Sequence, residues 1–116
     1  LEGGGLPLLK LSREMNIEVD NEEERVAIQI LKDALSVPCK QILRNAGDDE
    51  DEVVEQMLTN QYGYDVKNQI YGDMYKMGII DPLKVTKNAL INAVSVATTI
   101  LSTNAIVTLA RTYDSK

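Results

Sequence analysis

A chain of 116 residues is about one domain long, and a hydrophobic share of 44% suffices for a buried core and argues against disorder. With 12 basic and 18 acidic residues, the net charge of −6 argues against a nucleic-acid partner, because phosphate binding needs clustered lysine and arginine. The absence of histidine excludes imidazole metal sites and Ser-His or Cys-His catalysis, and a single cysteine, Cys39, excludes an internal disulfide.

The beginning of the chain resembles the interior of a longer protein, since Leu1 is followed by a glycine run and no initiator methionine is present. The start of the sequence lacks the basic segment followed by an apolar run that would indicate a signal peptide. The apolar stretch over residues 89–101 is too short and too interrupted for the roughly 20 residues of a membrane span. We therefore expect no membrane partner.

Three consecutive glycines, Gly3, Gly4 and Gly5, precede the first predicted helix. Pro7 is tolerated only in a first turn, so this helix should begin at about Leu6. Glycines let a backbone approach a ligand closely, and N–H groups at a helix start favour anions or hydroxyls. The spacing matches neither a Walker loop nor a dinucleotide fingerprint. A flexible leader is the alternative interpretation.

A second helix is predicted to begin after Asn21, which forms a capping-box pattern with Glu24. Its apolar residues recur at helical spacing and predict one buried stripe: Val26, Ala27, Ile30, Leu31, Ala34 and Leu35. Pro38 lacks a backbone donor, so we expect a kink or break near Val37 before the helix ends at Gly47. We interpret Cys39 as a packed thiol, because no histidine is available to activate it.

The acidic run over residues 48–52 is interpreted as the solvated start of a third helix that ends near Asn60. It lacks the glycine and the ligand spacing of a calcium loop.

Beyond the acidic run, residues 62–64 are interpreted as a short extended piece with a glycine hinge. Ile70, Met74 and Met77 fit one face of a short helix.

A long helix, apolar on most sides, is predicted over residues 83–103, with Asp81 as its N-cap and Pro82 at its first position. Such a helix needs neighbours all round it, and the preceding helices are too few to cover it. A β-prone segment follows and predicts one strand with an open edge: Ala105, Ile106, Val107 and Thr108. The predicted fold is all-α, mainly helical, with a short β-hairpin or turn near residues 62–72 and one C-terminal strand.

Residues 62–82 contain an apolar slot, bounded by backbone turns and one carboxylate, that would suit a nucleoside. Ordinary turns with a helix cap are the alternative.

Five motifs, in order, resemble the C-terminal part of group I chaperonins, the GroEL family. These are the glycine triplet, the in-helix Pro38 ahead of Gln41-Ile42, the Tyr62-Gly63-Tyr64-Asp65 turn, residues 77–86, and a small-residue helix followed by Val107-Thr108. The resemblance covers nearly the whole chain.

The resemblance implies the second half of a discontinuous equatorial domain, which is mostly helical, binds ATP and forms most ring contacts. It implies that the ribose and adenine side of the pocket is lined by Gly4, Gly5, Tyr64, Asp65 and Val66. It further implies that Ile42 and Ile79 flank the adenine and that Asp81 binds the ribose hydroxyls. A carboxylate suits that role because it accepts hydrogen bonds from two neighbouring hydroxyls at once.

The implied partners are identical subunits in a double ring. Glu22, Lys40 and Asp49 match positions that carry charged contacts between rings, and the strand over residues 105–108 matches one that pairs with a neighbouring subunit. The phosphate loop and the residues that bind Mg²⁺ lie outside this chain, so we expect it to be inactive as an ATPase by itself. The domain that holds unfolded substrates and the co-chaperonin also lies outside it.

The resemblance allows three compartments: the bacterial cytoplasm, the mitochondrial matrix and the plastid stroma. The competing hypothesis is a small helical protein-interaction module with no nucleotide role. The two hypotheses differ in one geometric expectation. A nucleotide site requires the glycine triplet, Tyr64, Asp65 and Asp81 to converge on one concave surface, whereas an interaction module allows them to be scattered.

Overall fold

The computed structural model describes the backbone of residues 1–114 and the side chains of residues 1–103. Four helices and a small hairpin follow one another along the chain: α1 (Leu6–Glu14), α2 (Glu22–Asn45), α3 (Glu50–Asn60), β1 (Gly63–Asp65), β2 (Ile70–Gly72) and α4 (Leu83–Asp114). The two strands pair antiparallel. The mainly helical fold with a hairpin near residues 62–72 is therefore confirmed.

The predicted helix starts are set by local capping. Helix α1 begins at Leu6 with Pro7 in its first turn. At the start of α2, the Asn21 side chain accepts a hydrogen bond from the Glu24 N–H at 2.8 Å, and the Glu24 carboxylate accepts one from the Asp20 N–H at 2.8 Å. Helix α3 follows the same rule, with Asp49 as its N-cap. These short-range hydrogen bonds satisfy backbone donors that a helix start otherwise leaves free.

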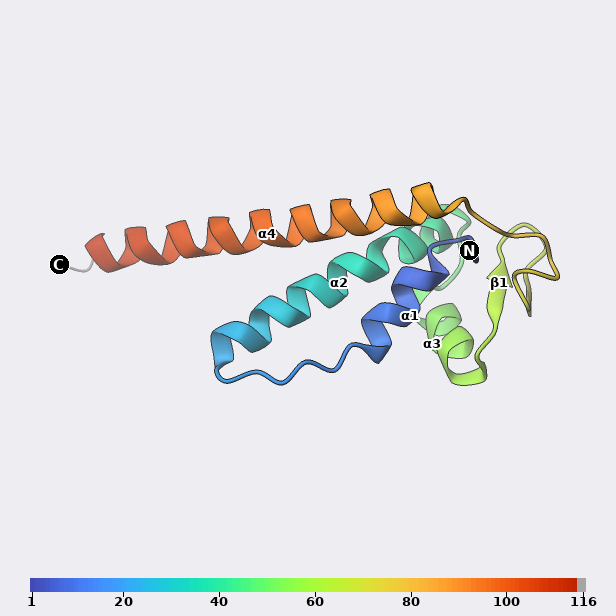
Figure 1. Cartoon of the computed structure of the whole chain (residues 1–116), viewed down its shortest axis with the longest axis horizontal. Helices are drawn as coiled ribbons and strands as arrows, with labels where there is room; N and C mark the ends of the chain where they lie inside the picture. The colour runs from blue at the N-terminus through green and yellow to red at the C-terminus, as the bar shows by residue number, and fades with distance from the viewer. Residues whose placement is uncertain (115–116) are drawn as a thin grey trace.

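A kink or a break was predicted near Val37, and the break is wrong because α2 runs as one helix through Pro38. Proline removes one backbone hydrogen bond, but Leu35 and Leu43 on either side are almost completely buried and hold both halves in place. The predicted stripe is also wrong in extent, because Leu35 is its only fully buried member. Helices α1 and α3 gather at the C-terminal part of α2 and leave its beginning uncovered (Figure 1).

The hairpin replaces the short helix expected around Ile70, Met74 and Met77, and that prediction is wrong. Strand β2 begins at Ile70, and Tyr64 lies opposite Tyr71 with their ring centroids 4.8 Å apart. Met74 is buried by packing under the hairpin: a side chain at Gly63 would place its Cβ 2.1 Å from the Met74 Cγ. Apolar spacing alone could not distinguish this packing from a helix face.

Helix α4 continues to Asp114, so the predicted C-terminal strand at Ala105, Ile106, Val107 and Thr108 is wrong. A helix satisfies its backbone groups internally, whereas a lone strand would need a partner that this chain does not offer in its described part. Helix α4 begins at Leu83, so Pro82 rather than Asp81 directly precedes it. Of the described helices, none combines the length and apolarity that crossing a bilayer would require.

The main core lies where α1, the C-terminal part of α2, α3 and the hairpin meet. Its buried members are Leu6, Leu9, Cys39, Leu43, Val53, Met57, Tyr64 and Met74. A smaller cluster of Leu8, Leu35 and Ala93 joins α4 to α1 and α2. Helix α4 packs on α2 along one side and extends beyond it (Figure 1), as expected of an apolar helix with too few neighbours.

Candidate functional site

The glycine triplet is held against the segment that leads into α4. The Gly3 N–H donates to the Ile79 carbonyl at 2.9 Å, and Glu2 forms an antiparallel bridge with Ile80. The Asp81 N–H donates to the Leu1 carbonyl at 2.8 Å. The alternative of a flexible leader does not fit these pairings, which instead place the triplet beside the residues that precede α4.

The backbone at Gly5 requires glycine. Its φ of +73° is a left-handed conformation, and it forms the N-cap of α1. A Cβ at this position would lie 2.7 Å from the Cys39 backbone nitrogen. The absence of a side chain therefore lets the start of α1 touch the middle of α2.

A first hollow of about 140 Å³ opens where the triplet, α2 and the hairpin meet. It is lined by Gly4, Leu6, Cys39, Ile42, Leu43, Met57, Tyr64, Val66, Met74 and Ile79. Five of the residues assigned by resemblance to the adenine side thus share one mainly apolar surface. They come from four separate segments of the chain.

A second hollow of about 160 Å³ adjoins the first. Its lining residues are Glu2, Gly5, Pro7, Leu8, Pro38, Ile42, Asp81, Val85, Thr86 and Ala89. Ile42 lines both hollows, so the two are neighbours on one surface. Between them, the hollows contain seven of the eight residues assigned to nucleotide contact.

Asp65 is the assigned residue that lines neither hollow. Its carboxylate accepts hydrogen bonds from the Lys67 N–H at 3.0 Å and from the Asn68 backbone and side chain at 3.2 and 2.8 Å. The Asn68 side chain is the main cause of the lowered pKa of Asp65. In this structure, Asp65 closes the turn between β1 and β2.

Tyr64 is oriented by Asp48, a residue that sequence reasoning had placed in a solvated acidic run. The buried Tyr64 hydroxyl donates to the Asp48 Oδ1 at 3.2 Å. Burial is the first cause of the raised pKa of Tyr64, and the negative charge of Asp48 adds to it. The two residues are 16 positions apart, and no local pattern predicts their pairing.

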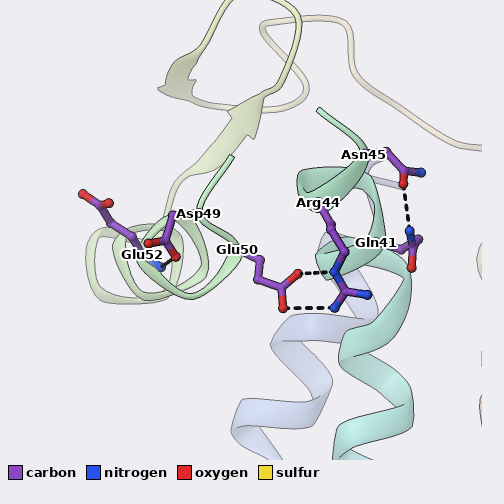
Figure 2. Close-up of polar contacts among 6 residues, drawn as sticks. All are labelled: Gln41, Arg44, Asn45, Asp49, Glu50 and Glu52. Atoms are coloured by element: carbon purple, nitrogen blue, oxygen red, sulfur yellow. Dashed lines mark hydrogen bonds and ion pairs between the residues drawn. The ribbon is translucent and has the colours of Figure 1, made fainter. Parts of the chain in front are cut away.

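The turn that carries Asp48 is braced by an ion pair. Arg44, in the last turn of α2, donates two hydrogen bonds to the Glu50 carboxylate in α3, at 2.9 and 3.1 Å (Figure 2). This two-point contact lowers the pKa of Glu50 through the hydrogen bond from Arg44. It links the end of α2 to the start of α3, on either side of the turn that carries Asp48.

The residues assigned to ring contacts do not form one cluster. Glu22 pairs with Arg25 in the first turn of α2. Lys40 lies near the other end of that helix, about 27 Å away along the axis at 1.5 Å per residue. Asp49 caps α3. The side chains of residues 105–108 lie outside the described residues.

The two adjoining hollows offer apolar walls, backbone groups and two carboxylates, Asp81 and Glu2, of which Glu2 is paired with Lys10. This arrangement is suited to binding. Within residues whose side chains are described, no three potential metal ligands of the His, Cys, Asp or Glu type gather. A family model described as the TCP-1/cpn60 chaperonin family matches residues 1–111, nearly the whole chain. A chaperonin-related role in protein folding follows from that match. The chain therefore belongs to the TCP-1/cpn60 chaperonin family.

Proposed function

We propose that the chain supplies the ribose and adenine wall of an ATP site in the equatorial domain of a group I chaperonin. The observation that carries the proposal is the pair of adjoining hollows centred on Ile42. Seven residues from distant parts of the sequence line them. Of the residues on which the two hypotheses differ, Gly4 and Tyr64 line the first hollow, Gly5 and Asp81 line the second, and Asp65 lines neither. Ile42, which lines both hollows, supports one continuous site.

The chemistry of each hollow fits one part of the nucleoside. Ile42, Val66 and Ile79 give the first hollow apolar walls, which suit the faces of a flat base through dispersion and burial. Asp81 gives the second hollow a carboxylate, which suits two adjacent ribose hydroxyls. Gly5 lines the second hollow together with Asp81, and its lack of a side chain leaves the backbone there accessible to a ligand.

The size of the hollows agrees with a partial site. Complete ligand pockets commonly measure about 300–1,000 Å³, and each hollow is smaller than that. In this proposal, groups outside residues 1–116 bind the phosphates and Mg²⁺, and the chain alone does not hydrolyse ATP. Bound ATP supplies the free energy for the conformational steps of the parent.

The proposal extends to the assembly. Identical subunits form a double ring, with Glu22, Lys40 and Asp49 at charged contacts between the rings. Unfolded substrates and a co-chaperonin bind domains beyond this chain. Bacterial cytoplasm, mitochondrial matrix and plastid stroma are the compartments that such a protein occupies.

A comparison of two nucleosides tests the role of Asp81. Adenosine and 2′,3′-dideoxyadenosine are titrated into the isotope-labelled chain while backbone NMR shifts are followed. Because hydrogen bonds to a carboxylate are stronger than neutral ones, adenosine should bind about tenfold more tightly. The shifts should gather at Gly4, Ile42, Val66 and Ile79.

The variant Asp81→Asn should remove most of that preference, since a neutral amide replaces the carboxylate. Asp20→Asn, an exposed change in the loop before α2, is the matched control and should retain it. Equal binding of both nucleosides by the unmodified chain would contradict the proposal. So would a preference that survives in Asp81→Asn.

A further inference from the structure

A third hollow, separate from the two described above, lies between α1, α2 and α3. It measures about 290 Å³ and is lined by three cationic side chains, Arg13, Lys32 and Lys40. We propose that it binds a compact polyvalent oxyanion of the diphosphate class. It shares no lining residue with the two hollows assigned to the nucleoside. Lys40 is also one of the residues proposed for contacts between rings, so the oxyanion site is proposed for the chain outside that contact.

The local charge is opposite to that of the chain. Three cations face one carboxylate, Asp33, in a protein with a net charge of −6. Among the described side chains, Lys32 and Lys40 form no ion pair. Arg13 pairs with Glu55 at 3.1 Å, but both side chains are mostly exposed, so this pair is weak and exchanges readily with a competing anion.

The hydrogen bonds around the hollow leave its cations available. The Asp33 carboxylate accepts from the Gln29 amide at 2.9 Å, and its carbonyl accepts from the Ser36 hydroxyl at 2.8 Å. The Ser36 contact is to the backbone of Asp33, so only the Gln29 amide, a neutral donor on the same helix, contacts its carboxylate. Among the described side chains, none forms an ion pair with Lys32 or Lys40, so both ammonium groups can donate to an anion, and the guanidinium of Arg13 has further N–H groups.

The spacing of the lysines indicates a ligand with more than one anionic group. Lys32 and Lys40 are eight residues apart on α2, which corresponds to about 12 Å along the helix axis. Long lysine side chains shorten this gap, but a small monovalent anion cannot contact both ammonium groups and Arg13 together. A ligand with two linked phosphates offers separate anionic groups to cations in different parts of the lining, and the planar guanidinium binds a phosphate through two parallel hydrogen bonds.

The test is a calorimetric titration of the chain with pyrophosphate at low salt, with sodium chloride as the ionic-strength control. Saturable binding is expected, and it should weaken as the salt concentration rises. The double variant Lys32→Gln/Lys40→Gln should weaken it about tenfold, because two charge-assisted contacts are lost. Lys76→Gln/Lys84→Gln, an equal loss of charge at exposed positions elsewhere, should leave it unchanged.

A parallel titration with citrate distinguishes a site for phosphates from a site for polyvalent oxyanions in general. Either outcome of this comparison supports an oxyanion site. Pyrophosphate that binds clearly more tightly than citrate assigns the site to phosphates, whereas equal binding assigns it to both classes. The proposal is overturned if pyrophosphate shows no saturable binding, or if the two double variants weaken it equally. Asp81→Asn should not alter pyrophosphate binding, which separates this result from the nucleoside test.

Discussion

The packed end of the molecule and the outer side of α4 differ in how their apolar residues are covered. Where α1, α2, α3 and the hairpin meet, Leu6 and Leu43 are 1% and 2% exposed. Along α4, Leu83 is 67% and Ile91 53% exposed, although this helix is the most apolar of the four. The hollows discussed as candidate sites lie at the packed end, and the start of α4 lines part of one of them. The outer side of α4 presents an apolar surface of the kind that interfaces use.

The largest expected effect separates the packed end from the outer side of α4 by stability. Leu43→Ala should lower the free energy of unfolding by about 2–5 kcal/mol, because it leaves a cavity in the main core. Ile91→Ala removes a similar side chain from the exposed side of α4 and should change stability by about 0.5 kcal/mol or less. Urea denaturation followed by circular dichroism measures both. Similar losses for the two variants would show that the packed end and the outer side of α4 do not differ.

A somewhat smaller effect is expected at the glycine that joins α1 to α2. Gly5→Ala adds a Cβ within 2.7 Å of the Cys39 backbone, at a φ of +73°. We expect a loss of about 2–3 kcal/mol, of which the backbone conformation accounts for about 1 kcal/mol.

Gly47→Ala is the matched control, since Gly47 also has a positive φ but nothing lies within 4 Å of the added Cβ. It should show only the cost of backbone conformation, about 1 kcal/mol. The difference between the two losses in denaturant measures the close approach. Equal losses would mean that α1 and α2 do not need to touch at Gly5.

How much the sequence predicts follows from the range of each interaction. Asn21 and Gly47 mark the ends of α2 because capping depends on neighbouring residues. Pro38 and residues 105–108 gave wrong predictions because packing and chain continuity outweigh local propensity. Most residues of the candidate site were predicted through the family resemblance. The Tyr64–Asp48 pair was not predicted, because it joins a strand to a turn 16 residues away and no sequence pattern indicates it.

The smallest expected effect is a pH dependence that originates in the packed end. Burial raises the pKa of Cys39 from 9.0 to about 11, because the core disfavours the thiolate. The unfolded chain therefore loses this proton first as the pH rises. The stabilisation is fully present below pH 9.0 and is lost as the pH rises toward about 11.

Denaturation midpoints at pH 8 and pH 10.5 measure this contribution, and Cys39→Ala is the control that lacks the thiol. The decline in stability between the two pH values should be steeper in the unmodified chain than in the variant. Identical declines would assign the pH dependence to other groups, such as the tyrosines.

The most direct test of the proposed nucleoside wall is photoaffinity labelling with an azido-adenosine, followed by mass-spectrometric mapping of the attachment sites. Attachment should concentrate on Ile42, on residues 64–66 and on Ile79, and excess adenosine should abolish it. Attachment spread along the exposed side of α4, or insensitive to adenosine, would contradict the account.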